Sequence, residues 1–531
     1  MRNRTILVAL ALLALTISAA RTALLPGEHR LDAAAEPDGR LPSNSIIDIV
    51  PQSDSIWFGT GRGLAQLHLS TGGWATVTQA NGLGQGGVSA IAVTDTMLWA
   101  ATAYSVNTDY GWKPAGGGVG FSRDGGESWS WVAQPVDSAG VEYYEPTTTN
   151  IQNVTYDIAL SDSAVWIVSY GGGLRRMFYR DMAAGNLVWN IITPDTLSFS
   201  ALLHLNHRCF SAVYADGSLF IGTAEGINRT DDEGGHWRQF RFQPGGGGIT
   251  GEFVTALAAQ EYGGTTRIWA ATWQAESAAH YYGIAVTENF GDSWRSVLSD
   301  SAYSVDDGLT WRTPPTGTPA PDGSLLLIDE LGQLKVHNFG FDEASGRVWA
   351  AADGGLWFSD DFGGVWSRWS APIVDPTIGE RFDDADFYSV VAAGDSLLVG
   401  TDDGVAVGWP GAGGYTWRIH RAFQPAGEAG EPDTYAYPNP FSPLRGHTTR
   451  FQVRADSPAA AQLDIYNFAM EKLFGASSTL LPGGGAGDMA GYGALNWDGR
   501  DSGGNIVANG VYFYRIKAGG RTLWGKVMVL D

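Results

Sequence analysis

The sequence predicts an all-β protein in which a seven-bladed β-propeller is followed by a small antiparallel β-sandwich. Three observations support this fold class. A strand–turn–strand pattern recurs along the 531 residues, glycine occurs 72 times, and aromatic residues make up 12% of the chain. A chain too long for one ordinary core, rich in turns and aromatic residues, is typical of many short strands arranged as repeats.

The N-terminus predicts export. Arg2 and Arg4 precede an almost wholly apolar run over 6–17, and the small residues Ser18, Ala19 and Ala20 follow it. This order is that of a secretory signal peptide, so we expect residues 1–20 to be removed, with an uncleaved N-terminal anchor as the alternative. Since no later segment approaches the ~20 apolar residues of a membrane helix, we expect no membrane span in the mature chain.

Charge and cysteine content exclude further classes. The formal net charge of −23 repels phosphate backbones and argues against a nucleic-acid partner. Cys209 is the single cysteine, so an internal disulfide is impossible. It lies in a strand-like segment, where we expect a small buried side chain.

The repeat is centred on an apolar strand that is preceded by a strand of alternating apolar residues, such as 88–93. Such alternation predicts strands, and units of about four strands predict propeller blades. We expect the propeller over 44–423, with an eighth, degenerate blade left open. The seven copies of the central strand are 56–60, 98–102, 165–169, 219–223, 268–272, 348–352 and 397–401.

A second repeat has the form Ser/Thr-x-Asp-x-Gly-x-x-Trp and occurs at 122–129, 230–237, 287–294, 304–311 and 359–366. It predicts a hairpin turn in which the first side chains cap backbone N–H groups, glycine adopts a positive φ and tryptophan packs beneath. We place the copy at 304–311 in an insertion. The repeats resemble the Asp-box (BNR) repeats of sialidases, sortilin-type receptors and other glycoside hydrolases. The residues assigned to this structural role are Ser122, Asp124, Gly126, Trp129, Asp232, Trp237, Trp294, Asp306, Trp311, Asp361 and Trp366.

The first repeat carries another resemblance. Residues 41–46, 56–60 and the pair Gly63 and Leu64 are similar to the two-component-regulator propeller repeat. That family includes bacterial sensor ectodomains and a propeller subunit of the type IX cell-surface attachment machinery. A sensor ectodomain is disfavoured here because no membrane helix or signalling domain follows.

A polar stretch over 424–434 reads as a linker, and 435–531 as a separate sandwich domain. The motifs at 437–441, 497–501 and 510–515 resemble the FlgD-type Ig-like domain and the type A sorting domain of type IX secretion. The resemblance implies an Ig-like fold and sorting or attachment by the type IX machinery. Asp531 departs from it, because type IX signals often end in a basic residue, and a purely structural sandwich stays an alternative.

Candidate catalytic residues are few. A xyloglucanase-like hydrolase needs two carboxylates across a cleft, for which the loop residues Asp383, Asp384 and Asp386 are weak candidates. A sialidase needs three arginines, which the sequence does not place together. His204, His207 and Cys209 have the wrong spacing for a closed zinc site, so we expect neither a metal nor a cofactor.

Loop aromatics are the candidate binding residues: Tyr143, Tyr144, Trp273, Tyr281 and Tyr282. Such rings stack on sugars or anchor a protein partner, although they also pack under their own loops. The sequence therefore predicts an exported, non-enzymatic binding or scaffold protein with a glycan or protein ligand at the propeller loop face. We expect it outside the cell or on the surface of a Gram-negative-type bacterium, with the periplasm as the alternative location and a secreted glycoside hydrolase as the alternative function.

Overall fold

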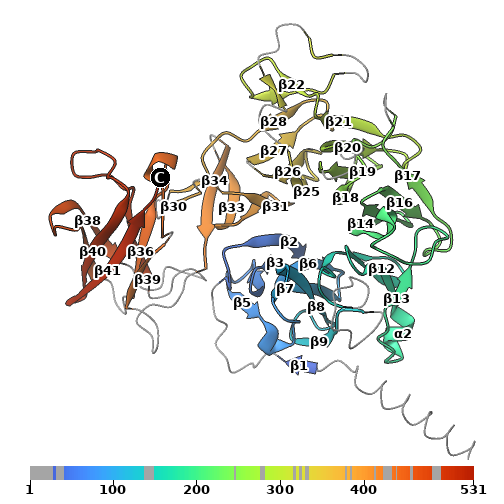
Figure 1. Cartoon of the computed structure of the whole chain (residues 1–531), viewed down its shortest axis with the longest axis horizontal. Helices are drawn as coiled ribbons and strands as arrows, with labels where there is room; N and C mark the ends of the chain where they lie inside the picture. The colour runs from blue at the N-terminus through green and yellow to red at the C-terminus, as the bar shows by residue number, and fades with distance from the viewer. Residues whose placement is uncertain are drawn as a thin grey trace, which may run out of the picture.

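The computed structural model describes residues 28–30, 41–136, 149–243, 247–274, 281–314, 319–321, 326–328, 334–353, 355–376, 380–382, 385–411, 414–422, 433–437, 439–454, 459–480 and 492–531. The described residues are nearly all β structure, as expected, and most of their strands lie in four-stranded antiparallel sheets (Figure 1). The predicted signal peptide at 1–20 lies outside the described residues.

Seven consecutive meanders lie between Ile46 and His420. The first three sheets contain β2 (Ile46–Gln52), β3 (Ser55–Thr60), β4 (Gly63–His68) and β5 (Trp74–Val77); β6 (Gly87–Val93), β7 (Leu98–Thr108), β8 (Gly111–Ser122) and β9 (Ser128–Val132); and β10 (Thr155–Leu160), β11 (Ala164–Ser169), β12 (Gly173–Phe178) and β13 (Asn190–Ile192). A short strand, β1 (Glu28–Arg30), pairs with the outer strand β9, and a short helix, α2 (Tyr179–Ala183), precedes β13.

The next four sheets repeat this order. They contain β14 (Cys209–Ala215), β15 (Ser218–Thr223), β16 (Gly226–Thr230) and β17 (Arg238–Phe240); β18 (Val254–Tyr262), β19 (Thr265–Thr272), β20 (Gly283–Thr287) and β21 (Arg295–Ser299); β25 (Val336–Phe341), β26 (Val348–Ala352), β27 (Gly355–Ser359) and β28 (Trp366–Arg368); and β31 (Phe387–Ala393), β32 (Ser396–Thr401), β33 (Gly404–Gly411) and β34 (Gly414–His420).

The second strand of each sheet is largely buried over its apolar core segment. Every residue of β3, β11, β15 and β26 is buried. This is expected where neighbouring sheets cover both faces of a strand, because both sets of side chains then face apolar surroundings. The tryptophans in these strands, such as Trp57, Trp166 and Trp349, are fully buried and fill the space between adjacent sheets.

The seven sheets pack side by side in a ring. Each first strand contacts the first strand of the next sheet in the order β2, β6, β10, β14, β18, β25 and β31, and β31 contacts β2 again (Figure 1). The Ser389 hydroxyl donates a 3.3 Å hydrogen bond to the Ile46 carbonyl at this closing contact. The chain therefore brings its first and last sheets together, as expected of a propeller.

Short additional strands lie before the sixth sheet and between the sixth and seventh sheets. The expected insertion lies between β21 and β25, where β22 (Tyr303–Ser304) pairs with β24 (Leu326–Leu327) and β23 (Thr310–Trp311) pairs with the outer strand β28. Another strand pair, β29 (Val374–Asp375) and β30 (Glu380–Arg381), lies between the sixth and seventh sheets.

The C-terminal region is a two-sheet sandwich. One sheet contains β35 (Thr434–Tyr437), β36 (Thr449–Arg454) and β39 (Tyr492–Trp497), and the other contains β38 (Lys472–Leu480), β37 (Ala459–Tyr466), β40 (Gly510–Ala518) and β41 (Arg521–Val529). Phe451, Trp497 and Tyr514 are buried in a core that both sheets share.

A buried charge cluster joins the sandwich to the last sheet of the ring. Asp403, between β32 and β33, accepts hydrogen bonds from Arg421 at 2.8 and 3.1 Å, and Arg450 of β36 lies 3.6 Å from the same carboxylate. The side chains of Arg421 and Arg450 are 1% and 5% exposed. Arg381 also donates a 2.8 Å hydrogen bond to the Gly446 carbonyl, so two independent contacts cross this joint.

Candidate binding site in the central cavity

The first strand of every sheet in the ring contains a β-bulge near its start. In β2, Ile46 pairs with Thr60 and Asp48 with Gly59, which leaves Ile47 without a partner in the ladder. A bulge bends the strand and re-aims the extra side chain. The bulged residues of the seven strands are Ile47, Ser89, Tyr156, Phe210, Thr255, His337 and Tyr388.

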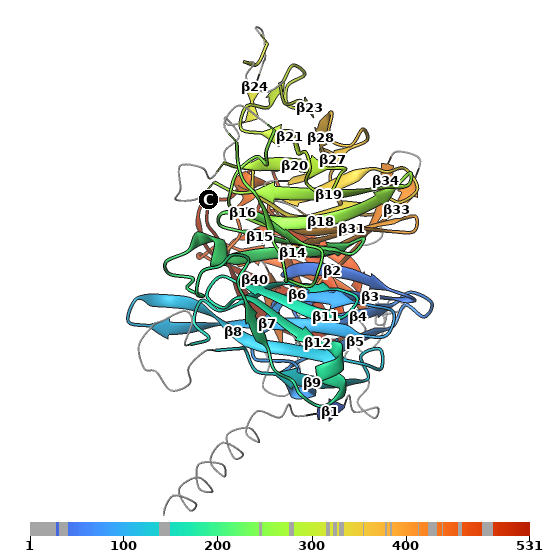
Figure 2. The same cartoon turned by 90° about the vertical axis from the view of Figure 1, so that its right-hand side faces the viewer.

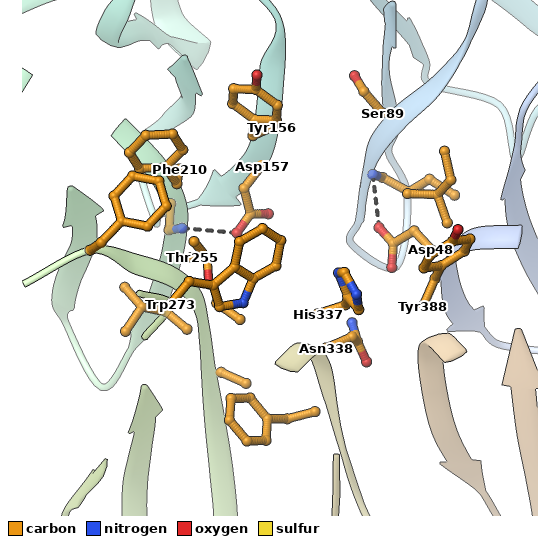
Figure 3. A pocket seen from close by; sticks show the side chains of 18 of the residues that line it. Asp48, Ser89, Tyr156, Asp157, Phe210, Thr255, Trp273, His337, Asn338 and Tyr388 are labelled. Carbon is orange, nitrogen blue, oxygen red and sulfur yellow. Dashed lines mark hydrogen bonds between the residues drawn. The ribbon is translucent and has the colours of Figure 1, made fainter. Parts of the chain in front are cut away.

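All seven bulged residues line one cavity of about 770 Å³. Phe253 and Trp273, which flank β18 and β19, add two more rings to the wall. Figure 3 shows Tyr156, Thr255 and Trp273 on one side of this space and His337 and Tyr388 on the other. A concave space of this size, in which aromatic walls alternate with polar groups, is a usual form of a ligand site.

The aromatic walls are held in place by contacts between neighbouring sheets. Phe210 lies with its ring centroid 5.9 Å from that of Tyr156 and 4.6 Å from that of Phe253. In a second group, His337 meets Trp273 and Tyr388 edge-to-face at 5.2 and 5.4 Å. The rings thus form two connected groups rather than isolated side chains.

Hydrogen bonds orient the rings of the second group. Trp273 donates from Nε1 to the Val336 carbonyl at 3.0 Å, and His337 Nε2 lies 2.7 Å from Asp353 Oδ1. Burial raises the pKa of Tyr388, with the nearby Asp402 charge adding to it, and burial likewise raises the pKa of Tyr156. Both phenols therefore stay protonated and can donate hydrogen bonds to a ligand.

The residue after the bulge connects one sheet to the next. Asp48 accepts hydrogen bonds from Ile49 N at 2.9 Å and from Ile91 N of the second sheet at 3.1 Å. Asp157 does the same with Ile158 N and with Ala212 N of the fourth sheet, both at 2.8 Å. These carboxylates are accordingly built into the ring as well as into the cavity wall.

In the sixth sheet, the residue after the bulge is Asn338, which has an amide side chain. Asn338 Oδ1 accepts a 3.3 Å hydrogen bond from Val390 N of the seventh sheet. In the fourth sheet the position is Ser211, whose hydroxyl donates to the Val254 carbonyl at 3.3 Å. A short polar acceptor or donor at this position is thus a recurring link between adjacent sheets.

The two carboxyls differ from ordinary aspartates in their protonation. Burial raises the pKa of Asp48 from 3.8 to about 6 and that of Asp157 to about 7, and the Asp48 charge contributes to the shift of Asp157. Because the Asp48 charge raises the pKa of Asp157, the two carboxyls lie within electrostatic reach of one another. Both residues line the cavity and both titrate near neutral pH.

The cavity contains one of the five predicted binding aromatics. Trp273 lies in its wall, whereas Tyr281 packs against Phe242 with ring centroids 4.9 Å apart. Tyr282 is not an exposed loop residue, because it is 2% exposed and belongs to the core between the fifth and sixth sheets. Tyr143 and Tyr144 lie outside the described residues.

Of the three candidate catalytic carboxylates, the structure describes one. Asp383 and Asp384 lie outside the described residues. Asp386 is exposed, does not line the cavity, and uses its backbone N–H to donate to Asp402 Oδ1 at 3.1 Å. The carboxylates that do line the cavity, Asp48 and Asp157, were not singled out from the sequence. Their signal was a charged residue inside an otherwise apolar inner strand.

The five repeats each form the same kind of hydrogen-bonded turn. In the first copy, Gly126 N donates to Ser122 Oγ and Ser128 N donates to Asp124 Oδ1, both at 2.9 Å. Equivalent hydrogen bonds occur in the other four copies, with Asn289 replacing Asp in the third. Trp129 completes the first turn by donating to the Gly126 carbonyl at 3.0 Å.

Hydrogen bonds within these turns hold the carboxylates in the charged form. The His236 side chain lowers the pKa of Asp232 to about 2, and the Thr310 hydroxyl does the same for Asp306, because both stabilise the charged form by hydrogen bonds. Among the residues that the structure describes, no group of three or more His, Cys, Asp or Glu side chains could hold a metal ion.

His207 and Cys209 both have contacts within the fold. His207 accepts a hydrogen bond from Ser200 N at Nδ1 (3.0 Å), so Nε2 carries the proton that faces Asp195 at 3.1 Å. Cys209 is buried, and burial raises the pKa of its thiol. Both side chains are therefore part of the packing between the third and fourth sheets.

Comparisons with known proteins gave structural likeness alone. No family model and no curated protein matches the chain. Solved structures similar to it include PorZ, a surface component of the type IX secretion system of Porphyromonas gingivalis (14% identity, 92% of this chain and 66% of that chain, TM-score 0.40). A GH74 enzyme of Niastella koreensis (11%, 95% and 74%, 0.47) and the extracellular domain of a one-component system of B. thetaiotaomicron (10%, 93% and 88%, 0.31) are similar as well.

At such low identities and TM-scores, these structures do not indicate a reaction or a ligand for this chain. The fold described above follows from the arrangement of its own sheets. No helix in the described part of the chain has the length and apolarity needed to cross a bilayer.

Proposed function

We propose that this chain is an exported, non-enzymatic binding protein that holds a partner in the central cavity of a seven-bladed propeller. The observation that carries the proposal is the set of seven bulges, because each sheet turns one extra side chain into the same space. A bulge disrupts the strand ladder and re-aims a side chain, and here all seven re-aimed side chains line one cavity.

The polar groups of the cavity support a binding role. The Thr255 hydroxyl oxygen is buried in the cavity wall and has no hydrogen-bond partner among the described residues. A buried polar atom without a partner costs free energy unless a ligand or water supplies one. Asp48, Asp157 and Asn338 already use backbone N–H groups, which favours a structural and binding role over acid–base catalysis.

The remaining parts of the proposal concern assembly and export. We take the seven sheets as blades, the five repeated turns as Asp-box turns, and 435–531 as an Ig-like domain of the FlgD or type A sorting kind that connects the propeller to type IX-type machinery. The joint at Asp403 supports an attached sandwich, since removing it would expose Arg421 and Arg450. Mass spectrometry of both ends of the mature protein, after fractionation of the host, tests this. An intact C-terminus at the cell surface supports a retained attachment domain, and loss of the residues after 437 supports a cleaved sorting domain. An intact C-terminus in the periplasm overturns the type IX part of the proposal.

The binding role is tested with a blocked cavity. The wild-type chain and a Thr255→Trp variant, which fills the cavity, are used to capture ligands from an envelope extract and from a glycan array. Leu203→Trp, a change at an 80% exposed position outside the cavity, is the control. We expect capture by the wild type and the control that the blocked variant loses. Equal capture by all three chains would contradict a ligand site in the cavity.

The hydrolase alternative depends on the loop carboxylates. Turnover of xyloglucan or sialosides by the wild type that Asp384→Asn abolishes would replace the binding proposal with an enzymatic one. Retained ligand capture without turnover supports the non-enzymatic role.

A further inference from the structure

The wall of the cavity carries negative charge that nothing in the described chain neutralises. Asp48 comes from the first sheet and Asp157 from the third, and the charge of one raises the pKa of the other. No lysine or arginine belongs to the cavity lining. Figure 3 shows the two carboxyls facing the space from opposite sides.

The hydrogen bonds of these carboxylates leave room for a ligand. Each accepts two backbone N–H groups, one per oxygen, and neither forms an ion pair among the described residues. A carboxylate has about four acceptor sites, so roughly two remain on each side chain. Backbone N–H groups supply only partial charge, and a full cation in the cavity would stabilise both carboxylates much more.

The aromatic lining suits the same kind of ligand. Six of the lining residues carry rings that contact one another in two groups: Tyr156, Phe210, Phe253, Trp273, His337 and Tyr388. The face of such a ring attracts a cation, most strongly when water is excluded. The chain already uses this attraction outside the lining, because the Lys335 ammonium lies 5.7 Å from the Trp273 ring centroid.

The two phenols of the lining do not offset the charge. Tyr156 and Tyr388 stay neutral because their pKa values are raised, and His337 faces the cavity with Asp353 behind it at 2.7 Å. Lys335 lies outside the lining and is 3.9 Å from the same Asp353. Above neutral pH the cavity is therefore an anionic, aromatic-walled space.

We propose that the central cavity binds a cationic side chain, lysine or arginine, presented by a protein ligand. This inference rests on the proposed binding function and names the chemistry of its ligand. A neutral glycan offers no charge to the two carboxylates, and an acidic glycan would be repelled by them, so the lining favours a basic protein segment. The cavity of about 770 Å³ accommodates such a side chain together with part of its backbone.

The test uses the full chain and small probes of defined charge. N-acetyl-lysine methylamide and N-acetyl-arginine methylamide are titrated by calorimetry at pH 8 and pH 5, with N-acetyl-glutamine methylamide as the neutral probe. We expect the cationic probes to bind at pH 8 at least tenfold more tightly than the neutral one, and to lose this preference at pH 5, where both carboxyls are protonated. Equal binding of the three probes would overturn the inference.

Variants assign the effect to the two carboxylates. Asp48→Asn and Asp157→Asn should each weaken binding of the cationic probes at pH 8 at least tenfold, whereas Asp292→Asn, at an exposed carboxylate in a turn outside the cavity, should not. Asn338 shows that an amide is accepted at the equivalent position, and the far-UV spectrum and melting temperature check the folding of each variant. His337→Gln separates the histidine from the carboxylates in the pH response: loss of the pH response in this variant alone would overturn the role of Asp48 and Asp157.

Competition separates the two proposals. If an envelope ligand captured by the wild type is lost in Thr255→Trp but is not displaced by the cationic probes, the cation inference fails and the binding function stands. If the blocked variant captures as much as the wild type, the cavity is not the ligand site and both proposals fail.

Discussion

The six-membered ring of Trp57 in the first sheet lies directly against Gly126 in the turn of the second sheet. A Cβ at Gly126 would be 2.9 Å from Cζ2 of this ring and closer still to Cη2. The turn of the second sheet therefore packs against the buried tryptophan of the first sheet. Gly126 also has a φ of 97°, which L-residues rarely adopt.

Gly126→Ala should therefore destabilise the protein strongly. Steric overlap with Trp57 adds to backbone strain, and we expect a loss of about 2–4 kcal/mol in the free energy of unfolding. Gly125→Ala is the matched control, because a Cβ there meets nothing within 4 Å and the other turns carry Glu233, Phe290, Asp307 or Phe362 at this position. Denaturant unfolding of both variants checks the difference, and equal losses would contradict it.

A second prediction concerns the acceptor within the repeated turn. Asp361 Oδ1 accepts from Val365 N at 2.8 Å and from the Ser359 hydroxyl at 2.9 Å. Asp361→Ala removes this acceptor and should cost about 1–2 kcal/mol. Asp361→Asn should be nearly neutral, because Asn289 accepts the same two hydrogen bonds in the third copy. Thermal melts compare the two variants, and similar melting temperatures would show that the hydrogen bonds matter little.

The stability of the ring should depend on pH through Asp157. Its pKa is about 7 in the folded protein and 3.8 for an unperturbed aspartate, so the folded state binds the proton more tightly. The contribution is fully present below about pH 4 and is lost as pH rises through 7. Between pH 5 and pH 8 the loss from this group is about 3 kcal/mol, at 1.36 kcal/mol per pKa unit.

Asp157→Asn should remove this pH dependence. Relative to the wild type, the variant should become more stable as pH rises from 5 to 8, and urea unfolding at several pH values measures this. Asn338→Asp is the converse variant, since it places a carboxyl at the equivalent link and should add a loss of stability toward pH 8. Parallel pH profiles of all three chains would contradict the assignment.

The joint between ring and sandwich should depend on Asp403. Asp403→Ala would leave the buried guanidinium groups of Arg421 and Arg450 close together without their carboxylate. Breaking a buried pair in this way typically costs 3–5 kcal/mol, so we expect at least about 3 kcal/mol here. Limited proteolysis should then release the sandwich faster.

Asp360→Ala is the control for this prediction. Asp360 pairs with Arg347 on the surface, where its side chain is 58% exposed, and a surface pair contributes little. The two variants should differ in the rate at which the sandwich is released. Equal rates would show that the Asp403 cluster does not hold the domains together.

The local features of this protein were readable from the sequence. The repeated turns close within eight residues, so the residue types at 122–129 or 359–366 carry all the information that the turn needs. The apolar second strands were equally clear, because both of their faces are buried and every side chain is selected for packing. Repetition then predicted a ring of such units.

Loop aromatics were harder to interpret. Trp273 does line the cavity, but Tyr282 is a core residue because it comes directly before β20 and packs between two sheets. Sequence alone does not distinguish an aromatic residue that ends a loop from one that begins a strand, because the burial of its ring depends on which sheet packs against it.

The sequence by itself determined the all-β class, the repeated unit and the turn chemistry, because each depends on hydrogen bonds and packing within one short segment. Only the tertiary structure decided the candidate site. Asp48 and Asp157 lie in different sheets, and each gains its raised pKa and its neighbour's N–H only when the ring brings separate inner strands together. A carboxylate in a strand becomes part of a site through neighbours distant in the chain, and no local pattern specifies those neighbours.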